Sequence, residues 1–305
     1  MKVIVFGGSG FLGSHVADAL DDAGHDVTIY DLKRSPYLRK SQKMIVGDCL
    51  DEQKVLSAVK GKEVVYNFSG IADIEEACRS PFNTIKTNII GNTIILEASV
   101  KTKVKRFVFA SSMYVYSKYG SFYRSSKQSC ELLIENYSEA YGLPYTILRY
   151  GSLYGPRADE RNFIYRIIKQ AFIENKISRH GDGEELREYI HVHDAARGSV
   201  EILAKEFANQ NVIISGNQQM RIRDFLYMIK EMFDNKIKIE FLPARNNPGH
   251  YEITPYTFAP KIGKKLTNRL YFDLNQGILD MIYDMHKRLG SEQSDSRSLR
   301  RGATK

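Results

Sequence analysis

Three glycines, each three residues after the last, separate the first apolar segment of the chain from its first helix-like segment. The run reads V-F-G-G-S-G-F-L-G and contains Gly7, Gly10 and Gly13. One glycine permits a tight turn, another lets the backbone approach a pyrophosphate, and the last lets the helix pack closely on the sheet. The helix N-terminus then presents free N–H groups and partial positive charge to phosphates. Because the turn lies between a strand and a helix, it predicts a dinucleotide-binding unit and not merely a tight turn.

Strand-like and helix-like segments alternate through the first half of the chain. The expected strands are Val3–Phe6, Val27–Tyr30, Met44–Val46, Val64–Phe68, Phe107–Ala110 and Tyr145–Arg149. The expected helices are Phe11–Asp22, Glu52–Val59, Pro81–Val100 and Tyr123–Tyr141. Continuous apolar strands separated by helices predict an α/β fold, with a doubly wound parallel (Rossmann) sheet covered on both faces.

The pattern is looser after Gly151. It predicts a strand at Ile190–His193, a helix that continues to about Lys205, a strand at Asn211–Ile214 and an amphipathic helix at Ile222–Phe233. We therefore expect a smaller C-terminal α/β lobe that binds substrate. The expected division is a cofactor-binding domain over 1–150 and about 186–215, the lobe over 151–185 and 216–289, and a disordered Ser/Arg-rich tail over 290–305.

Composition narrows the classes of function. The 305 residues are 43% hydrophobic, which is enough for a substantial core, and no window approaches the roughly 20 apolar residues of a membrane span. The formal charge of +8 comes without a nucleic-acid motif, so we interpret it as a solvated basic surface. Three scattered cysteines indicate neither disulfides nor a zinc cluster, and they favour a cytoplasmic location. His191 and His193 are expected on one face of a strand, but no third ligand accompanies them, so no metal is expected.

Two aspartates point to the adenosine half of the dinucleotide. Asp31 ends the second expected strand, where a carboxylate accepts both ribose hydroxyls of NAD and repels the 2′-phosphate of NADP. Lys33 and Arg34 would favour that phosphate, so NAD is expected and NADP is the alternative. Asp48, followed by Cys49, ends the third strand where an adenine amino group can be met; an ordinary turn aspartate is the other interpretation.

A tyrosine and a lysine four residues apart are candidates for acid–base chemistry. In Y-R-S-S-K, Tyr123 and Lys127 share one face of a helix. The ammonium would lower the pKa of the phenol, and a phenol tuned in this way acts as a general base at neutral pH. Ser111 and Ser112 end the fifth strand, where a hydroxyl can bind the same substrate oxygen. A surface pair is the alternative for Tyr-x-x-x-Lys, but its place after a serine-ended strand favours catalysis.

These motifs together resemble the extended short-chain dehydrogenases/reductases, in particular the NAD-dependent epimerase/dehydratase family with UDP-glucose 4-epimerase-like members. The resemblance covers Met1 to about Phe233 and continues more weakly to Gly290. The matching pieces are G-G-S-G-F-L-G-S-H, V-G-D, N-F-S-G, T-N-I-I-G-N, F-A-S-S-M-Y-V-Y, Y-R-S-S-K, L-R-Y-G-S-L-Y-G-P-R and L-R-E-Y-I-H-V-H-D.

The resemblance implies roles for individual residues. Ser112, Tyr123 and Lys127 would be catalytic, with Tyr123 as the base and Lys127 on the nicotinamide ribose. Arg187 would hold a substrate diphosphate, for which a planar guanidinium is suited, and Arg245 is a second candidate for the same role. Residues expected to line the cofactor are Phe11, Leu12, Phe68, Ser69, Gly70, Asn88 and Ser111, in addition to the three glycines, Asp31, Asp48 and Cys49.

The chain also departs from the family's pattern near the sugar. Met113 and Tyr114 replace the Asp-Glu pair that nucleotide-sugar dehydratases of this class carry, which argues against a common 4,6-dehydratase. The stretch between Tyr116 and Tyr123 is shorter than in typical epimerases. Ser152 stands where the family usually has an asparagine at the diphosphate, and Asp73 lies in a loop expected to face the substrate, where solvated acids are also common.

The resulting hypothesis is an epimerase that acts on a nucleoside-diphosphate sugar with tightly bound NAD and transient oxidation at sugar C4. A keto-sugar reductase that consumes NADH or NADPH is the alternative, followed by a dehydratase or a non-catalytic cofactor-binding protein. The resemblance also implies a homodimer, in which Pro81–Val100 and Tyr123–Tyr141 pair across the interface. Neither nucleic acid nor a membrane is expected as a partner.

Overall fold

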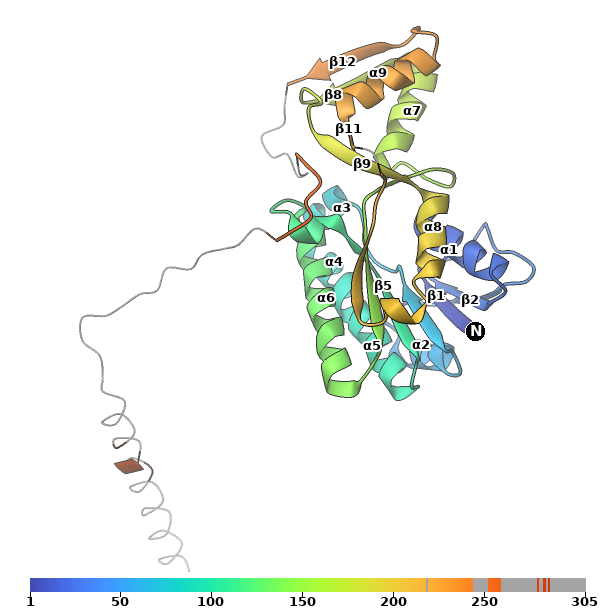
Figure 1. The fold of residues 1–305 in the computed structure, drawn as a ribbon, viewed down its shortest axis with the longest axis vertical. Coiled ribbons are helices and arrows are strands. Elements are labelled where there is room, and N and C mark those ends of the chain that lie inside the picture. The colour runs from blue at the N-terminus through green and yellow to red at the C-terminus, as the bar shows by residue number, and fades with distance from the viewer. Residues whose placement is uncertain (218, 244–251, 259–278, 280–281, 284, 286–305) are drawn as a thin grey trace, which may run out of the picture. The chain divides into compact units, whose positions relative to one another are not determined.

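Seven parallel strands form the central sheet of the molecule (Figure 1). The computed structural model describes residues 1–217, 219–243, 252–258, 279, 282–283 and 285. The strand order is β10-β6-β5-β4-β1-β2-β3, so the chain winds outward from β1 in both directions. The strands are β1 (Lys2–Phe6), β2 (Asp26–Asp31), β3 (Lys43–Val46), β4 (Val64–Asn67), β5 (Arg106–Ser112), β6 (Tyr145–Tyr150) and β10 (Gln210–Ile214).

Helices cover both faces of this sheet (Figure 1). On one face an apolar core lies under α2 (Glu52–Val59), α5 (Gly91–Lys101) and α6 (Ser121–Tyr141). On the other face a second core lies under α1 (Phe11–Asp22) and α8 (Val192–Glu201). The predicted doubly wound parallel sheet is therefore confirmed.

The first strand shows why its sequence is apolar without alternation. Val3 and Val5 enter the core under α1 and α8, whereas Ile4 and Phe6 enter the core on the opposite face. Successive side chains of a strand point to opposite faces, so a strand buried on both sides needs apolar residues at every position.

A smaller α/β part follows β6, and it has an apolar core of its own. Its helices α7 (Phe163–Glu174) and α9 (Ile222–Met232) pack with the parallel pair β8 (Lys176–His180) and β12 (Lys238–Leu242). A three-stranded sheet joins β7 (Ser152–Tyr154), β9 (Leu186–His191) and β11 (Gln219–Arg221). All of these elements belong to one compact unit, Met1–Ala259. The expected tail over 290–305 lies outside the described residues.

The structure corrects the sequence prediction at four places. The long helix expected at Pro81–Val100 consists of α4 (Pro81–Thr84), the π-helix η1 (Ile85–Ile90) and α5. A short helix that was not predicted, α3 (Ile74–Arg79), precedes it, and the η2 turn (Met113–Tyr116) precedes α6. The strand expected at Ile190–His193 ends at His191, and His193 belongs to α8.

Within the described part of the chain, no helix has the length and apolar character that a bilayer crossing requires.

Candidate active site

The glycine turn contains positions that no side chain can enter. Gly7 has φ +73°, and a Cβ atom there would lie 2.6 Å from the carbonyl carbon of Phe68. A Cβ atom on Gly13 would lie 2.3 Å from the carbonyl oxygen of Gly7. Gly10 is the N-cap of α1 and gives it no side-chain cap, so the amides of Phe11 and Leu12 in the first turn remain available to an anion.

Asp31 lies directly beside this turn. Its Oδ2 accepts a hydrogen bond from the backbone N–H of Ser9 at 2.9 Å, and the Ser9 hydroxyl donates to the carbonyl of Lys33 at 2.9 Å. The carboxylate that ends β2 is therefore attached to the glycine turn, 22 residues earlier in the chain.

Asp48 and Cys49, which follow β3, both interact with nearby parts of the chain. The Oδ1 atom of Asp48 accepts from the backbone N–H of Leu50 at 2.9 Å, which is the geometry of a turn aspartate. Cys49 is buried, and burial raises the pKa of its thiol to about 11, so the sulfur is a protonated packing group. A Cβ atom on Gly91 would lie 2.8 Å from that sulfur, so the thiol fills the space beside α5.

Asn88 connects the segment after β4 to α6. Its Oδ1 accepts from the backbone N–H of Ile71 at 2.7 Å, and its Nδ2 donates to the carbonyl of Ile71 at 3.0 Å and to the Ser126 hydroxyl at 2.9 Å. Gly70 has φ +145°, and a Cβ atom there would lie 2.8 Å from Asn88 Oδ1. The Phe68–Gly70 segment and the middle of Y-R-S-S-K are thus held by one buried amide.

Tyr123, Lys127 and Ser112 lie at the carboxyl end of β5 and the start of α6. The Lys127 ammonium is buried, donates to the carbonyl of Ala110 at 2.7 Å, and lies 5.8 Å from the centre of the Tyr123 ring. Burial lowers the pKa of Lys127, whereas the nearby Glu131 carboxylate acts in the opposite direction. Tyr123 is half-buried, and Ser112 Oγ accepts from the backbone N–H of Tyr114 at 3.3 Å. A phenol beside a fixed cation is suited to proton transfer.

A buried ion pair behind these residues was missed in the sequence analysis. Glu131 accepts from Arg149 Nη2 at 2.7 Å and Nε at 3.0 Å, and it also accepts from the Ser111 hydroxyl at 2.5 Å. Arg149 in turn donates to the Tyr116 hydroxyl. Two features of the sequence could have indicated this pair. Glu131 lies four residues after Lys127 and therefore on the same helix face. Arg149 is a single charged residue inside an apolar strand.

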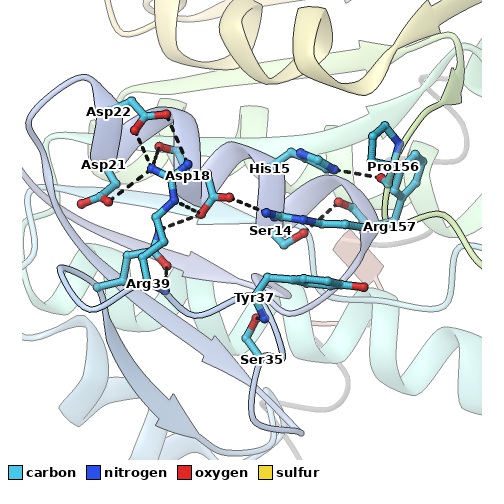
Figure 2. Close-up of polar contacts among 12 residues, drawn as sticks. Ser14, His15, Asp18, Asp21, Asp22, Ser35, Tyr37, Arg39, Pro156 and Arg157 are labelled. Carbon is cyan, nitrogen blue, oxygen red and sulfur yellow. Dashed lines mark hydrogen bonds and ion pairs between the residues drawn. The ribbon is translucent and has the colours of Figure 1, made fainter.

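A second polar cluster fixes α1, the helix that follows the glycine turn (Figure 2). Arg157 Nη2 donates to Asp18 Oδ2 at 2.7 Å, and the Arg157 guanidinium lies 4.4 Å from the centre of the Tyr37 ring. Arg39 forms ion pairs with Asp18 and with two further aspartates of the same helix, Asp21 and Asp22. The segments after β2 and β7 are thereby attached to α1.

The predicted substrate residues have diverse surroundings. Arg187 is buried, and its Nη1 donates to the carbonyls of Leu186 at 2.9 Å and Glu252 at 3.4 Å. Ser152 begins β7. Asp73 is the N-cap of α3, where it accepts from the backbone N–H of Glu76 at 2.7 Å. Arg245 lies outside the described residues.

The histidines form a cluster of tilted and edge-to-face rings, not the strand face that the sequence suggested. The ring of His193 lies 4.9 Å from those of both His15 and His191, measured between centroids. His15 also has a hydrogen bond to the carbonyl of Pro156 at 2.9 Å. Among the described residues, no group of three or more His, Cys, Asp or Glu side chains is placed to hold a metal ion.

Comparisons with known proteins identify the family and agree with the fold. A model described as the NAD dependent epimerase/dehydratase family matches residues 3–215. The UDP-N-acetyl-alpha-D-glucosaminuronate decarboxylase of Bacillus cytotoxicus is 30% identical over 268 residues, which are 79% of this chain and 83% of that protein. The crystal structure of UDP-glucose 4-epimerase from Thermotoga maritima with UDP-glucose has a TM-score of 0.77 at 26% identity, over 85% of this chain and 90% of that one. UDP-glucuronic acid 4-epimerase from Bacillus cereus, in complex with UDP-glucuronic acid and NAD, has a TM-score of 0.76 at 26% identity, with the same coverage.

Proposed function

The chain belongs to the NAD dependent epimerase/dehydratase family, and on this premise we propose that it epimerises a nucleoside-diphosphate sugar by transient oxidation at sugar C4. The observation that carries the proposal is the buried ammonium of Lys127, which lies 5.8 Å from the centre of the Tyr123 ring at the serine-ended edge of β5. The Thermotoga maritima and Bacillus cereus structures, each 26% identical to this chain, are named as 4-epimerases of UDP-sugars.

The residues around the glycine turn fit NAD, on which the family depends. The turn excludes side chains at Gly7 and Gly13, and the uncapped start of α1 suits a pyrophosphate. Asp31 beside the turn suits the two ribose hydroxyls, and its charge opposes the extra phosphate of NADP. Lys127 would bind the nicotinamide ribose. When bound, NAD accepts a hydride from the sugar and returns it, so that no cofactor is consumed.

Three side chains would take part in proton transfer at the C4 hydroxyl of the sugar. Tyr123 removes the proton of the C4 hydroxyl as its general base, and Ser112 forms a hydrogen bond with the same oxygen. The Lys127 ammonium stabilises the phenolate that this removal requires, because an adjacent positive charge favours the ionised phenol. Tyr123 returns the proton to the sugar oxygen after the keto-sugar has turned its other face.

The sugar nucleotide would lie between the carboxyl ends of the parallel strands and the smaller α/β part. We assign the diphosphate to Arg187, with Ser152 and Arg245 as further candidate ligands, and the sugar hydroxyls to the region of Asp73. Arg187 is buried, and its positive charge and planar guanidinium suit an anionic ligand.

We also propose a homodimer formed by α4, η1 and α5 together with α6. Apolar side chains on these helices face solvent in the single chain: Phe82 is 76% exposed and Leu132 is 62% exposed. Exposed apolar groups of this size on adjacent helices are typical of a protein–protein contact. The size of the protein in solution, with and without Leu132→Glu, tests this part of the proposal.

Tyr123→Phe is the decisive variant, and Tyr141→Phe, which alters an exposed tyrosine at the end of α6, is its control. We expect Tyr123→Phe to lose activity by about 10²- to 10⁴-fold on a UDP-sugar without losing bound NAD. The control should retain activity. Product analysis by NMR with UDP-glucose and UDP-glucuronic acid measures the outcome, and full activity in Tyr123→Phe would refute the assignment.

Two other outcomes are defined by the same assay. A reductase oxidises one added NADH or NADPH for each sugar converted, whereas an epimerase needs no added reductant. The 30% identical decarboxylase suggests the second alternative, because a ketone at C4 makes a C5 carboxylate a β-keto acid that can lose CO₂. Release of CO₂ from a UDP-linked uronic acid would identify that activity.

A further inference from the structure

Tyr114 contacts both residues that would hold the reacting hydroxyl. Its backbone N–H donates to Ser112 Oγ at 3.3 Å. Its ring meets the Tyr123 ring edge to face, with 6.2 Å between centroids and 75° between planes. One residue therefore sets the surroundings of the serine hydroxyl and of the phenol together.

The Tyr114 ring also packs against Gly120, in the short turn over residues 117–120. This glycine has φ +96°, and a Cβ atom on it would lie 2.7 Å from Tyr114 Cδ1. The left-handed conformation and the ring contact both require glycine at this position. The ring thus contacts both the backbone of the short turn and the phenol that would act as base.

The short turn over residues 117–120 and the η2 turn before it are both attached to α6. Arg124 Nη1 donates to the carbonyl of Ser117 at 3.0 Å, and Gln128 Nε2 donates to the carbonyl of Val115 at 2.7 Å. Both donors come from the first two turns of the helix that carries Tyr123. The turn, the Tyr114 ring and Tyr123 therefore form one unit in which the phenol has a defined orientation.

From this arrangement we infer that Tyr114 is the positioning and specificity residue of the sugar pocket. Its ring holds the Tyr123 phenol toward the reacting hydroxyl, and it limits the size of the substituent on the sugar carbon next to the reacting one. The inference rests on the proposed function, because it assumes a sugar bound at Ser112 and Tyr123. The ligand class is a nucleotide sugar whose pyranose C–H groups pack against an aromatic ring.

The structural argument predicts two separable effects. An error of about 1 Å in the position of a reacting group can cost about a hundredfold in rate, so a phenol without its neighbouring ring should react slowly. A pocket discriminates a missing or additional methylene group by about 10- to 200-fold, so removing the ring should change the preference between sugars of different size.

The test compares Tyr114→Phe, which keeps the ring, with Tyr114→Ala, which removes it. UDP-xylose and UDP-glucose are the probes, because both sugars are neutral and differ only by the hydroxymethyl group on C5. We expect Tyr114→Phe to retain more activity than Tyr114→Ala, because the edge-to-face contact with the Tyr123 ring is kept. Tyr114→Ala should lose about tenfold or more in kcat with a smaller change in KM, and its kcat/KM ratio of UDP-glucose to UDP-xylose should rise about tenfold.

Each part of the inference has its own refutation. An unchanged kcat in Tyr114→Ala overturns the positioning role, and an unchanged sugar ratio overturns the specificity role. Tyr114→Leu fills the same space without a flat ring and replaces Tyr114→Ala if that variant does not fold. If wild type converts no nucleotide sugar at all, the proposed function fails. The positioning role is then judged from crystal structures with NAD, in which an unmoved Tyr123 ring in Tyr114→Ala overturns it.

Discussion

Arg149 and Glu131 form a two-pronged ion pair beneath the candidate active site, with Nη2–Oε2 and Nε–Oε1 distances of 2.7 and 3.0 Å. The two side chains are only 7% and 4% exposed. The pair joins β6 to α6, and through the Ser111 hydroxyl it also reaches the end of β5. Three elements that carry candidate site residues are thus connected by one carboxylate.

Removal of this carboxylate should destabilise the fold strongly. Glu131→Ala leaves the Arg149 charge buried without its partner, and breaking a buried pair in this way costs about 3–5 kcal/mol. Glu139→Ala, which removes an exposed carboxylate from the same helix, should stay within about 0.5 kcal/mol of wild type. Urea unfolding of both variants measures the difference, and equal stabilities would contradict the structural role of the pair.

Gly7 should be essential for cofactor binding for a local steric reason. Gly7→Ala places a methyl group 2.6 Å from the Phe68 carbonyl carbon, so the turn must open. Gly24 has a similar backbone, with φ +80°, but no atom lies within 4 Å of its added Cβ. Both alanines incur the same left-handed strain of about 1–2 kcal/mol, and only Gly7→Ala should lose NAD. Native mass spectrometry of the purified variants measures bound NAD, and retention by Gly7→Ala would refute the assignment.

Asp31 should determine the preference for NAD over NADP. Asp31→Asn keeps an oxygen that can accept from Ser9 N–H but removes the charge that repels a 2′-phosphate. We expect the NAD-to-NADP affinity ratio to fall by about tenfold or more, which corresponds to about 1.4 kcal/mol. Fluorescence titration with NADH and NADPH measures the ratio. Asp234→Asn, at an exposed site, is the control, and an unchanged ratio in Asp31→Asn would leave cofactor choice to other residues.

Glu63 should make stability depend on acid pH. Its side-chain hydrogen bond with Lys105 and the backbone N–H of Lys2 lower its pKa from 4.5 to about 2. Because the folded-state pKa is the lower one, the stabilisation is complete above about pH 4.5 and is lost as the pH falls toward 2. Glu63→Gln should therefore melt below wild type at pH 6, and the two melting curves should converge near pH 2. The side chain is partly exposed to solvent, so added salt should reduce the difference. A constant gap across this pH range would contradict the prediction.

Local signals in the sequence were sufficient for the parallel strands and for two helices of the first half of the fold. The predicted helices Phe11–Asp22 and Glu52–Val59 have the same bounds in the structure. For the second helix the reason is visible, because the Asp51 carboxylate accepts from the backbone N–H of Lys54 as an N-cap. The strands buried on both faces were equally predictable, because a short continuous apolar run is typical of such a strand.

Contacts between segments that are far apart in the sequence could not be predicted from local patterns. Glu131 and Arg149 are 18 residues apart and meet only because α6 packs beside β6. The pair β8 and β12 joins segments separated by about sixty residues, and only the register of the folded chain brings Ile177 opposite Ile239. Asp73 is a further case, because nothing in the sequence analysis indicated that its carboxylate caps α3; for Asp48 the turn aspartate seen in the structure was already the stated alternative.

Ile85–Ile90 is a π-helix. The number of residues in this part of the chain is therefore constrained, independently of which residues they are. Each residue of an α-helix advances the side chains by about 100° around the axis. Loss of a single residue from this turn would restore ordinary α-helical winding and swing Asn88 away from Ile71 and Ser126, or else rotate every apolar residue of α5 out of the core. Related chains that keep both contacts should therefore tolerate exchanges of side chains in this stretch but neither deletions nor insertions.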